Sequence, residues 1–168
     1  MRPKGEPASA LFDAVGTKDF PGSVITALEK GEGFWGNRAP YQAEGTGGGK
    51  VEIKKIGVVG AGQMGSGISE VCLSAGYLVL MSDISEEALQ KGRDRIVGDY
   101  EKAIKKGKMA PEQRDLFLGH LTTATDMAGF KDCDYIIEAA TENIALKEKV
   151  FQTLDMVAGS GVILASNT

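Results

Sequence analysis

Short apolar runs alternate with longer segments of helical periodicity along most of this chain. The apolar runs predict strands over residues 55–59, 77–82, 121–124, 135–139 and 162–165. Several of these runs are continuous rather than alternating with polar residues, which is typical of strands that are buried on both faces. Strands of this kind, separated by helical segments, predict a doubly wound α/β fold with a parallel sheet and right-handed crossovers. Such sheets bind ligands in a crevice at the carboxyl ends of the strands.

A glycine-rich turn joins the first predicted strand to the helix that follows it. Gly60, Gly62 and Gly65 stand in the pattern GxGxxG, and apolar residues recur at helical spacing from Ile68 onward. The first glycine permits a tight turn, the second lets the backbone approach a pyrophosphate, and the third lets the helix pack closely on the strand. The N-terminus of the helix presents N–H groups and the positive end of its dipole to the phosphates. The pattern predicts a Rossmann dinucleotide-binding domain.

Asp83 closes the second predicted strand, roughly 20 residues after the glycine turn. A carboxylate at this offset accepts hydrogen bonds from the ribose hydroxyls of NAD. The alternative is that Asp83 caps the N-terminus of the next helix, but its position at the end of a strand favours the ribose role. We expect NAD rather than NADP, because a 2′-phosphate would lie against the carboxylate and no arginine follows immediately.

A long helical hairpin is inserted between the second and third predicted strands. One helix is predicted over residues 85–106 and ends at Gly107, and a shorter one begins at Pro111. A hairpin of this length is additional structure that a nucleotide-binding fold does not need in order to bind its cofactor. Its basic run is either a solvated helix face or an anion site for a phosphate-bearing substrate. The run consists of Lys102, Lys105, Lys106 and Lys108.

Polar residues follow the fourth predicted strand at its carboxyl end. Glu142 and Asn143 lie in the connection, and Lys147 lies on the helix that follows. Because side chains at strand ends line the crevice, these residues are better functional candidates than a mid-helix charge such as Lys149. Glu138 lies among apolar residues within the strand. We expect it to be a structural carboxylate that accepts hydrogen bonds from backbone or side-chain donors.

The composition is that of a globular protein. Apolar residues make up 42% and charged residues 25% of the chain, so a substantial core is expected. The net charge of −4 argues against nucleic acid or an anionic membrane as the main partner. Cys72 and Cys133 lie beside apolar runs, so we expect buried reduced thiols in a cytoplasmic protein, and both a bacterial cytoplasm and an organelle matrix stay open. No apolar stretch is long enough for a membrane span, and we assign no metal site.

Residues 1–50 differ in composition from the rest of the chain. They hold nearly half of the glycines and every proline except Pro111. Segments of such composition are flexible and rarely form a packed core. We therefore predict a loosely ordered extension over residues 1–50 and a nucleotide-binding domain over residues 51–168. A few aromatic side chains either anchor the extension or mark a contact with a partner, and these are Phe34, Trp35 and Tyr41.

Taken in order, these motifs resemble the 3-hydroxyacyl-CoA dehydrogenase family, which includes 3-hydroxybutyryl-CoA dehydrogenases and the dehydrogenase part of multifunctional β-oxidation proteins. The resemblance extends from about Glu52 to Thr168. Other β-hydroxyacid dehydrogenases share the glycine turn, but the ordered set is more specific. The set comprises residues 60–68, Asp83, the lysine-bearing hairpin, Ile137-Glu138-Ala139 with Glu142, Asn143 and Lys147, and Ala165-Ser166-Asn167-Thr168.

The resemblance implies roles for particular residues. The positions that match cofactor contacts are Gly60, Gly62, Gln63, Met64, Gly65, Asp83, Glu142, Lys147 and Asn167. In the family, the glycine turn holds the pyrophosphate, the aspartate holds the adenine ribose, and the last three lie against the nicotinamide half of NAD. For the substrate, Lys106 matches a lysine near the CoA phosphate. At a neighbouring position, this chain has Asp99 where the family can offer a hydroxyl.

The activity implied by the resemblance is oxidation of a 3-hydroxyacyl-CoA to the 3-oxoacyl-CoA in fatty-acid metabolism. A histidine of the family removes the hydroxyl proton while NAD accepts a hydride. That histidine comes after the Ser-Asn-Thr segment, whereas His120 precedes the third predicted strand. We therefore assign no catalytic residue to this sequence.

We expect this chain to be the NAD-binding part of such an enzyme, truncated before the catalytic serine and histidine. On its own it is expected to bind NAD weakly and to lack turnover. The full-length form is expected to be a homodimer or part of a multifunctional chain. Two alternatives stay open at this point: a non-catalytic nucleotide-binding module, and another NAD-dependent β-hydroxyacid dehydrogenase.

Overall fold

The computed structural model of the chain describes residues 42–44 and 50–167. The aromatic side chains expected to anchor the extension lie outside these residues. Strand β1 (Gln42–Glu44) pairs antiparallel with β2 (Lys50–Glu52). Strand β1 lies before the boundary predicted between residues 50 and 51, and β2 spans it. The boundary itself stays a prediction.

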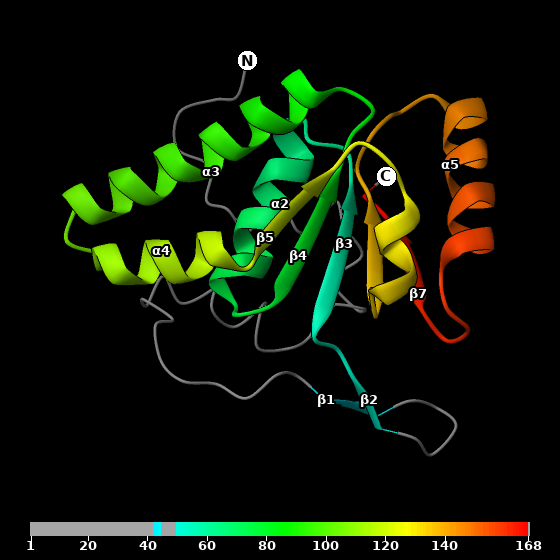
Figure 1. The fold of residues 1–168 in the computed structure, drawn as a ribbon, viewed down its shortest axis with the longest axis horizontal. Helices are drawn as coiled ribbons and strands as arrows, with labels where there is room; N and C mark the ends of the chain where they lie inside the picture. The colour runs from blue at the N-terminus through cyan, green and yellow to red at the C-terminus, as the bar shows by residue number, and fades with distance from the viewer. Residues whose placement is uncertain (1–41, 45–49, 168) are drawn as a thin grey trace.

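A five-stranded parallel sheet forms the centre of the molecule (Figure 1). Every neighbouring pair of strands in it is parallel, which confirms the predicted doubly wound fold. Each strand starts and ends within one residue of its predicted bounds. In spatial order the strands are β5 (Leu121–Ala124), β4 (Leu78–Ser82), β3 (Lys55–Val59), β6 (Tyr135–Glu138) and β7 (Ile163–Ser166). The direction of winding reverses between β3 and β6, so the ligand crevice is expected there.

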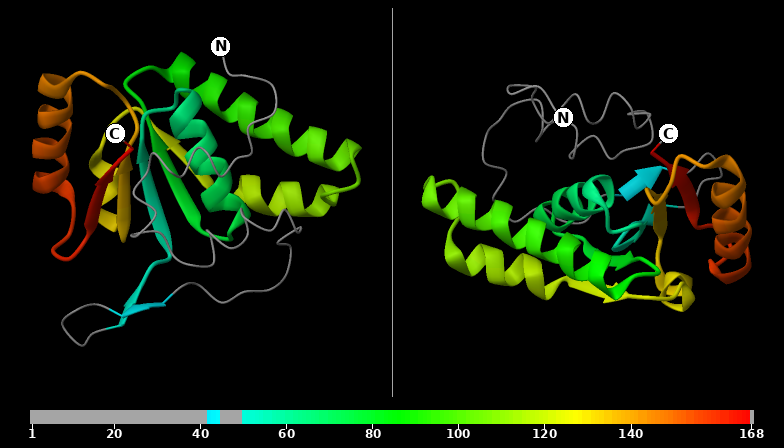
Figure 2. Two further views of the ribbon diagram at one scale, coloured as in Figure 1. Left: turned by 180° about the vertical axis from the view of Figure 1, so that it is seen from behind. Right: turned by 90° about the horizontal axis from the view of Figure 1, so that it is seen from above.

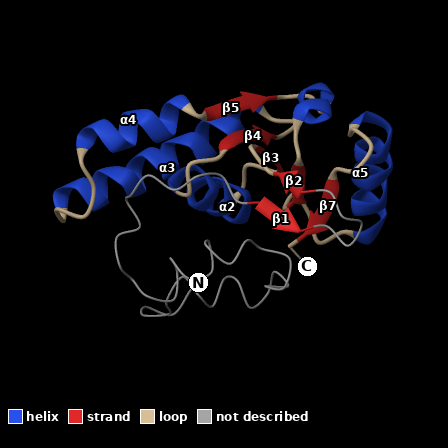
Figure 3. Ribbon diagram, turned by 90° about the horizontal axis from the view of Figure 1, so that it is seen from below, coloured by secondary structure: helices blue, strands red, loops and turns tan. Residues whose placement is uncertain are grey.

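Helices cover both faces of this sheet (Figures 2 and 3). Alternate residues of β3 contact the two faces, since Ile56 and Val58 join one apolar cluster and Val59 joins the other. This arrangement explains why the strand sequences are continuously apolar. The first face carries α2 (Gln63–Ser74), α3 (Glu86–Lys105) and α4 (Pro111–Gly119), and the second carries the 3-10 helix η3 (Ala128–Asp132) and α5 (Ile144–Val157).

The predicted helical hairpin is confirmed as α3 and α4, which project beyond the edge of the sheet (Figure 1). Ser85 begins α3 as its N-cap, where its side chain accepts a hydrogen bond from the Ala88 N–H. The alternative in which Asp83 caps this helix is therefore wrong. The aromatic rings of Tyr100 and Phe117 lie 5.8 Å apart between the two helices and hold the hairpin together.

Both cysteines are buried and carry free thiols, as the sequence predicted. Burial raises the pKa of the Cys72 thiol to about 12 and that of Cys133 to about 11. Among residues 42–44 and 50–167, no helix is both long and apolar enough to cross a membrane.

Candidate functional site

The glycine turn follows β3 and is held in place by close backbone contacts. Gly60 has a φ angle of +103°, and its N–H donates to the Ser82 carbonyl oxygen at 2.6 Å. A Cβ atom at Gly60 would lie 2.7 Å from the carbonyl oxygen of Ala139 on the neighbouring chain segment. A Cβ atom at Gly65 would lie 1.8 Å from the Gly60 carbonyl oxygen. The first and third glycines are thus required by the turn and by the packing of α2 on it.

The second glycine has open space beside it within the part of the chain that the structure describes. Gly62 is the N-cap of α2, and no heavy atom of residues 42–44 and 50–167 lies within 4 Å of the position that its Cβ would occupy. Among the same residues no side chain caps this end of the helix, and its first turn holds no acidic residue. The hydroxyl of Ser66 donates back to the Gly62 carbonyl oxygen at 2.7 Å and steadies the turn. The N-terminus of α2 therefore has the shape and the polarity to receive a phosphate group.

Asp83 connects the end of β4 to the glycine turn. One of its carboxylate oxygens accepts from the Ala61 N–H at 2.9 Å, and the other accepts from the Ser85 N–H at 3.1 Å. A carboxylate oxygen accepts more than one hydrogen bond, so Asp83 keeps acceptor capacity toward a ligand. Its position at the strand end, beside the turn, fits the ribose role predicted from the sequence.

Two residues of α3 also hold the glycine turn, and neither was predicted from the sequence. The Arg95 guanidinium donates to the Ala61 carbonyl oxygen at 3.3 Å. A Cβ atom at Gly92 would lie 2.7 Å from the same oxygen, so the helix approaches the turn at a point where only glycine fits. A signal was present, because glycine within a helix costs about 1 kcal/mol relative to alanine and calls for a packing reason.

A buried network of charged and polar side chains lies at the ends of β6 and β7. It is separated from Asp83 by the switch point, the place between β3 and β6 where the winding of the sheet reverses. Glu138 is fully buried at the end of β6, and one of its carboxylate oxygens accepts from the Ala140 and Thr141 N–H groups at 2.9 and 3.2 Å. The other oxygen accepts from the Ser166 hydroxyl at 3.1 Å and lies 2.9 Å from the Lys147 ammonium. The ammonium also donates to the Ser166 hydroxyl at 2.9 Å. The prediction of Glu138 as a hydrogen-bonded structural carboxylate is confirmed.

The network keeps Glu138 ionised. Burial by itself would raise the pKa of this carboxyl, because a charge is poorly solvated away from water. The hydrogen bonds from Lys147, Ala140, Thr141 and Ser166 outweigh that effect, and the pKa of Glu138 is lowered from its ordinary value. The site therefore contains a fixed anion and a fixed cation in direct contact.

The other predicted site residues fall into two groups. Glu142 is exposed between β6 and α5, and the Asn167 N–H donates to the Glu138 carbonyl oxygen at 3.0 Å. With Lys147, they gather at the carboxyl ends of β6 and β7. Lys106 lies instead at the exposed C-terminal end of α3, within the turn of the hairpin. His120, to which no site role was assigned, ends α4, and its carbonyl oxygen accepts from the Val79 N–H near the start of β4.

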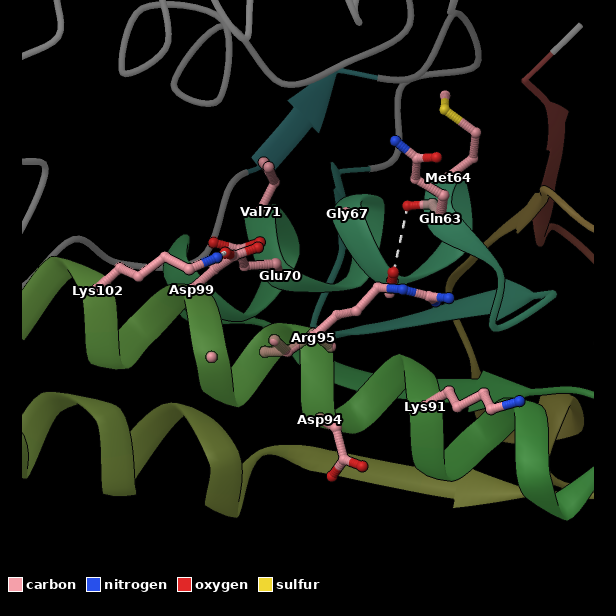
Figure 4. A pocket seen from close by; sticks show the side chains of 13 residues that line it. Gln63, Met64, Gly67, Glu70, Val71, Lys91, Asp94, Arg95, Asp99 and Lys102 are labelled. Carbon is pink, nitrogen blue, oxygen red and sulfur yellow. Dashed lines mark hydrogen bonds and ion pairs between the residues drawn. The ribbon is translucent and has the colours of Figure 1, made fainter. Parts of the chain in front are cut away.

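A groove of about 820 Å³ runs between α2 and α3, beside the glycine turn rather than over the strand ends (Figure 4). Gln63 and Met64, both predicted cofactor residues, line it. The side chains of Glu70, Asp99 and Lys102 lie close together farther along it (Figure 4). Burial is the main cause that raises the pKa of Glu70 to about 7, the Asp99 carboxylate adds to the rise, and Lys102 opposes it.

Comparisons with known proteins agree with this geometry. The sequence profile described as "3-hydroxyacyl-CoA dehydrogenase, NAD binding domain" matches residues 55–168. A 3-hydroxybutyryl-CoA dehydrogenase of Mycobacterium tuberculosis is 44% identical over 117 residues, which are 69% of this chain and 41% of the relative. A glyoxysomal fatty acid β-oxidation multifunctional protein of Brassica napus is 36% identical over 117 residues, which are 70% of this chain and 16% of the relative.

A solved structure supports the same assignment. The (S)-3-hydroxybutyryl-CoA dehydrogenase PaaH1 from Ralstonia eutropha superposes with a TM-score of 0.67 at 39% sequence identity, and the match covers 68% of this chain and 41% of that one. This chain thus spans about two fifths of the length of these two 3-hydroxybutyryl-CoA dehydrogenases. The glycine turn, the strand order and the matched residues agree, and the chain belongs to the 3-hydroxyacyl-CoA dehydrogenase family, with its NAD-binding domain in residues 55–168.

Proposed function

We propose that this chain is the NAD-binding part of an enzyme that oxidises a 3-hydroxyacyl-CoA to the 3-oxoacyl-CoA in fatty-acid metabolism. The observation that carries the proposal is the glycine turn. Within the described part of the chain, Gly62 has open space beside it at a helix N-terminus that no side chain caps, and Asp83 bonds the turn from the next strand. These residues fit a dinucleotide, because a phosphate and a ribose each meet groups of suitable polarity.

Different residues of the site would bind different parts of the cofactor. The α2 N-terminus, with Gly60, Gly62, Gln63, Met64 and Gly65, would hold the pyrophosphate, and Asp83 would accept from the adenine ribose. Glu142, Lys147 and Asn167 would position the nicotinamide half from the ends of β6 and β7. NAD supplies the hydride acceptor when bound. The chain's own part is to fix that acceptor's orientation, because transfer requires close approach to the alcohol carbon.

Titration calorimetry tests the assignment. The chain should bind NAD more tightly than NADP, because the Asp83 carboxylate would repel a 2′-phosphate. Asp83→Ala should cost about 1.5–3 kcal/mol of NAD affinity if the ribose bonds are charge-assisted. Asp134→Ala is the matched control, since Asp134 also accepts from two backbone N–H groups but lies just before β6, at the opposite end of the sheet. NADP binding as tight as that of NAD would refute the role of Asp83.

The hairpin is proposed to contact acyl-CoA through Lys106. If this ammonium meets a CoA phosphate, Lys106→Glu should weaken acyl-CoA binding in the full-length protein and leave NAD binding unchanged. The affinity for CoA should also fall with added salt, because exposed charges are screened. Lys149→Glu on α5 is the control, since Lys149 is equally a surface lysine. An unchanged affinity in Lys106→Glu would make the basic run a solvated face.

The setting of the enzyme is also a proposal. The full-length protein is proposed to act in the cytoplasm, as a homodimer or as part of a multifunctional chain. The β-oxidation relative of Brassica napus is itself named as a multifunctional protein. Size-exclusion chromatography with light scattering on the full-length protein would test the dimer, and a monomeric mass would refute it.

A further inference from the structure

The buried carboxylate of Glu138 has no part in the cofactor contacts described above, yet it lies at the crevice. We propose that Glu138 sets the preference of the site between oxidised and reduced cofactor by compensating the positive charge of Lys147. This proposal rests on the proposed function, because it assumes that NAD occupies the crevice. It assigns Glu138 a positioning and charge-balancing role, not a direct contact with the cofactor.

The location of Glu138 places its charge near the crevice. Its strand β6 pairs with β3 in a register that sets Glu138 opposite Val59, the residue directly before the glycine turn. The next residue, Ala139, has its carbonyl oxygen 2.7 Å from where a Cβ of Gly60 would lie. Glu138 thus lies next to the turn that would hold the pyrophosphate.

The strand order indicates which half of the cofactor lies near this pair. Asp83 on the β4 side of the turn would bind one ribose, and α2 would bind the pyrophosphate. A dinucleotide crosses the switch point of such a sheet, so its second half extends over the ends of β6 and β7. Lys147 and Ser166, which complete the network with Glu138, lie at those ends.

The charge of the pair is held in a fixed position. The side chain of Glu138 is 0% exposed and that of Lys147 is 17% exposed, and their charged atoms lie 2.9 Å apart. Ser166 bonds both of them, so the ammonium has little freedom to move toward solvent. Charges in such a poorly solvated place act more strongly on their neighbours than charges in water.

The two states of the cofactor differ in charge at the nicotinamide ring, which is positive when oxidised and neutral when reduced. The positive charge of the Lys147 ammonium beside the ring would by itself disfavour the oxidised state. The Glu138 carboxylate offsets that repulsion, so both states can bind. Removing its charge should therefore shift the preference toward the reduced cofactor.

The test compares the dissociation constants of NAD⁺ and NADH for the unmutated chain and for Glu138→Gln. Glutamine keeps the shape of the side chain and removes the charge. We expect the ratio of the two dissociation constants to move roughly three- to tenfold in favour of NADH. The matched control is Asp134→Asn, which removes one negative charge from just before the same strand, and in that variant the ratio should stay unchanged.

A second pair of variants separates charge from structure. Lys147→Gln should move the ratio toward NAD⁺, and the double variant Glu138→Gln/Lys147→Gln should bring it back close to that of the unmutated chain. If Glu138→Gln does not fold, as judged by circular dichroism, the shift of the ratio toward NAD⁺ in Lys147→Gln still tests the proposal. Equal weakening of both cofactors, or an unchanged ratio, would overturn the proposal. Failure of the unmutated chain to bind either cofactor would instead refute the proposed function.

Discussion

Substituting Gly92 by alanine tests whether α3 supports the glycine turn. A Cβ atom at this position would lie 2.7 Å from the Ala61 carbonyl oxygen and 3.2 Å from the Met81 Cε atom. The methionine is flexible and can yield, but the carbonyl is backbone. The peptide units on both sides of Ala61 are held by hydrogen bonds, because its carbonyl oxygen accepts from Arg95 and its N–H donates to Asp83. Either α3 or the turn must therefore move.

Gly98 in the same helix provides the reference, because no heavy atom of the described residues lies within 4 Å of the position that its Cβ would take. Gly98→Ala should stabilise the fold by about 0.5–1 kcal/mol, since alanine is the better helix former. Gly92→Ala gains the same propensity but adds a steric cost of about 1–3 kcal/mol from overpacking. We expect Gly92→Ala to be less stable than Gly98→Ala by that steric cost.

Urea denaturation followed by far-ultraviolet circular dichroism measures both variants. Calorimetry with NAD adds a second measurement, because a displaced Ala61 should weaken cofactor binding in Gly92→Ala. If Gly92→Ala proved as stabilising as Gly98→Ala and bound NAD normally, α3 would not support the turn and the packing argument would be refuted.

Three further predictions concern ionisable groups whose pKa values are shifted in the folded chain. The pKa of Glu70 is raised to about 7 from an ordinary value of 4.5, so the folded state holds a proton that the unfolded state has released and the free energy of unfolding falls as pH rises between these values. Glu70→Gln should therefore add about 1–2 kcal/mol at pH 8 and little at pH 5 in urea denaturation, and an equal gain at both pH values would contradict this. The pKa of Glu138 is lowered, so its contribution to stability is present above its ordinary value of 4.5 and is lost as pH falls through the folded-state value. Glu138→Gln should cost about 3 kcal/mol at pH 7 and less in acid, and a cost that did not change with pH would argue against an ionised Glu138. Because burial raises the pKa values of Cys72 and Cys133, iodoacetamide should label both far more slowly in the native chain than in urea at pH 8, and mass spectrometry showing equal rates would refute their burial.

The sequence by itself determined the order and the kind of most elements in the described part of the chain. Continuous apolar runs located the strands of the main sheet because a strand buried on both faces excludes polar residues. The pattern of Gly60, Gly62 and Gly65 located the turn because such a turn needs a positive φ angle at its first glycine, space for a ligand at its second and close packing at its third. Ser85 and Gly107 marked the ends of α3 through capping, which also depends only on neighbours in the chain. The short helix η3 and the pairing of β1 with β2 were not predicted, because neither segment has enough length for a periodic pattern.

Only the tertiary structure decided which distant residues meet. The contact of Glu138 with Lys147 and Ser166 depends on β6 and β7 lying side by side, and nothing in the local sequence states that order. The support of Ala61 by Arg95 and Gly92 depends on the crossing of α3 over the turn. The sequence could name a buried acid and a nearby lysine, but their pairing is set by strand order and helix packing. Those are properties of the whole sheet, because they arise from the burial of its two faces rather than from any one segment.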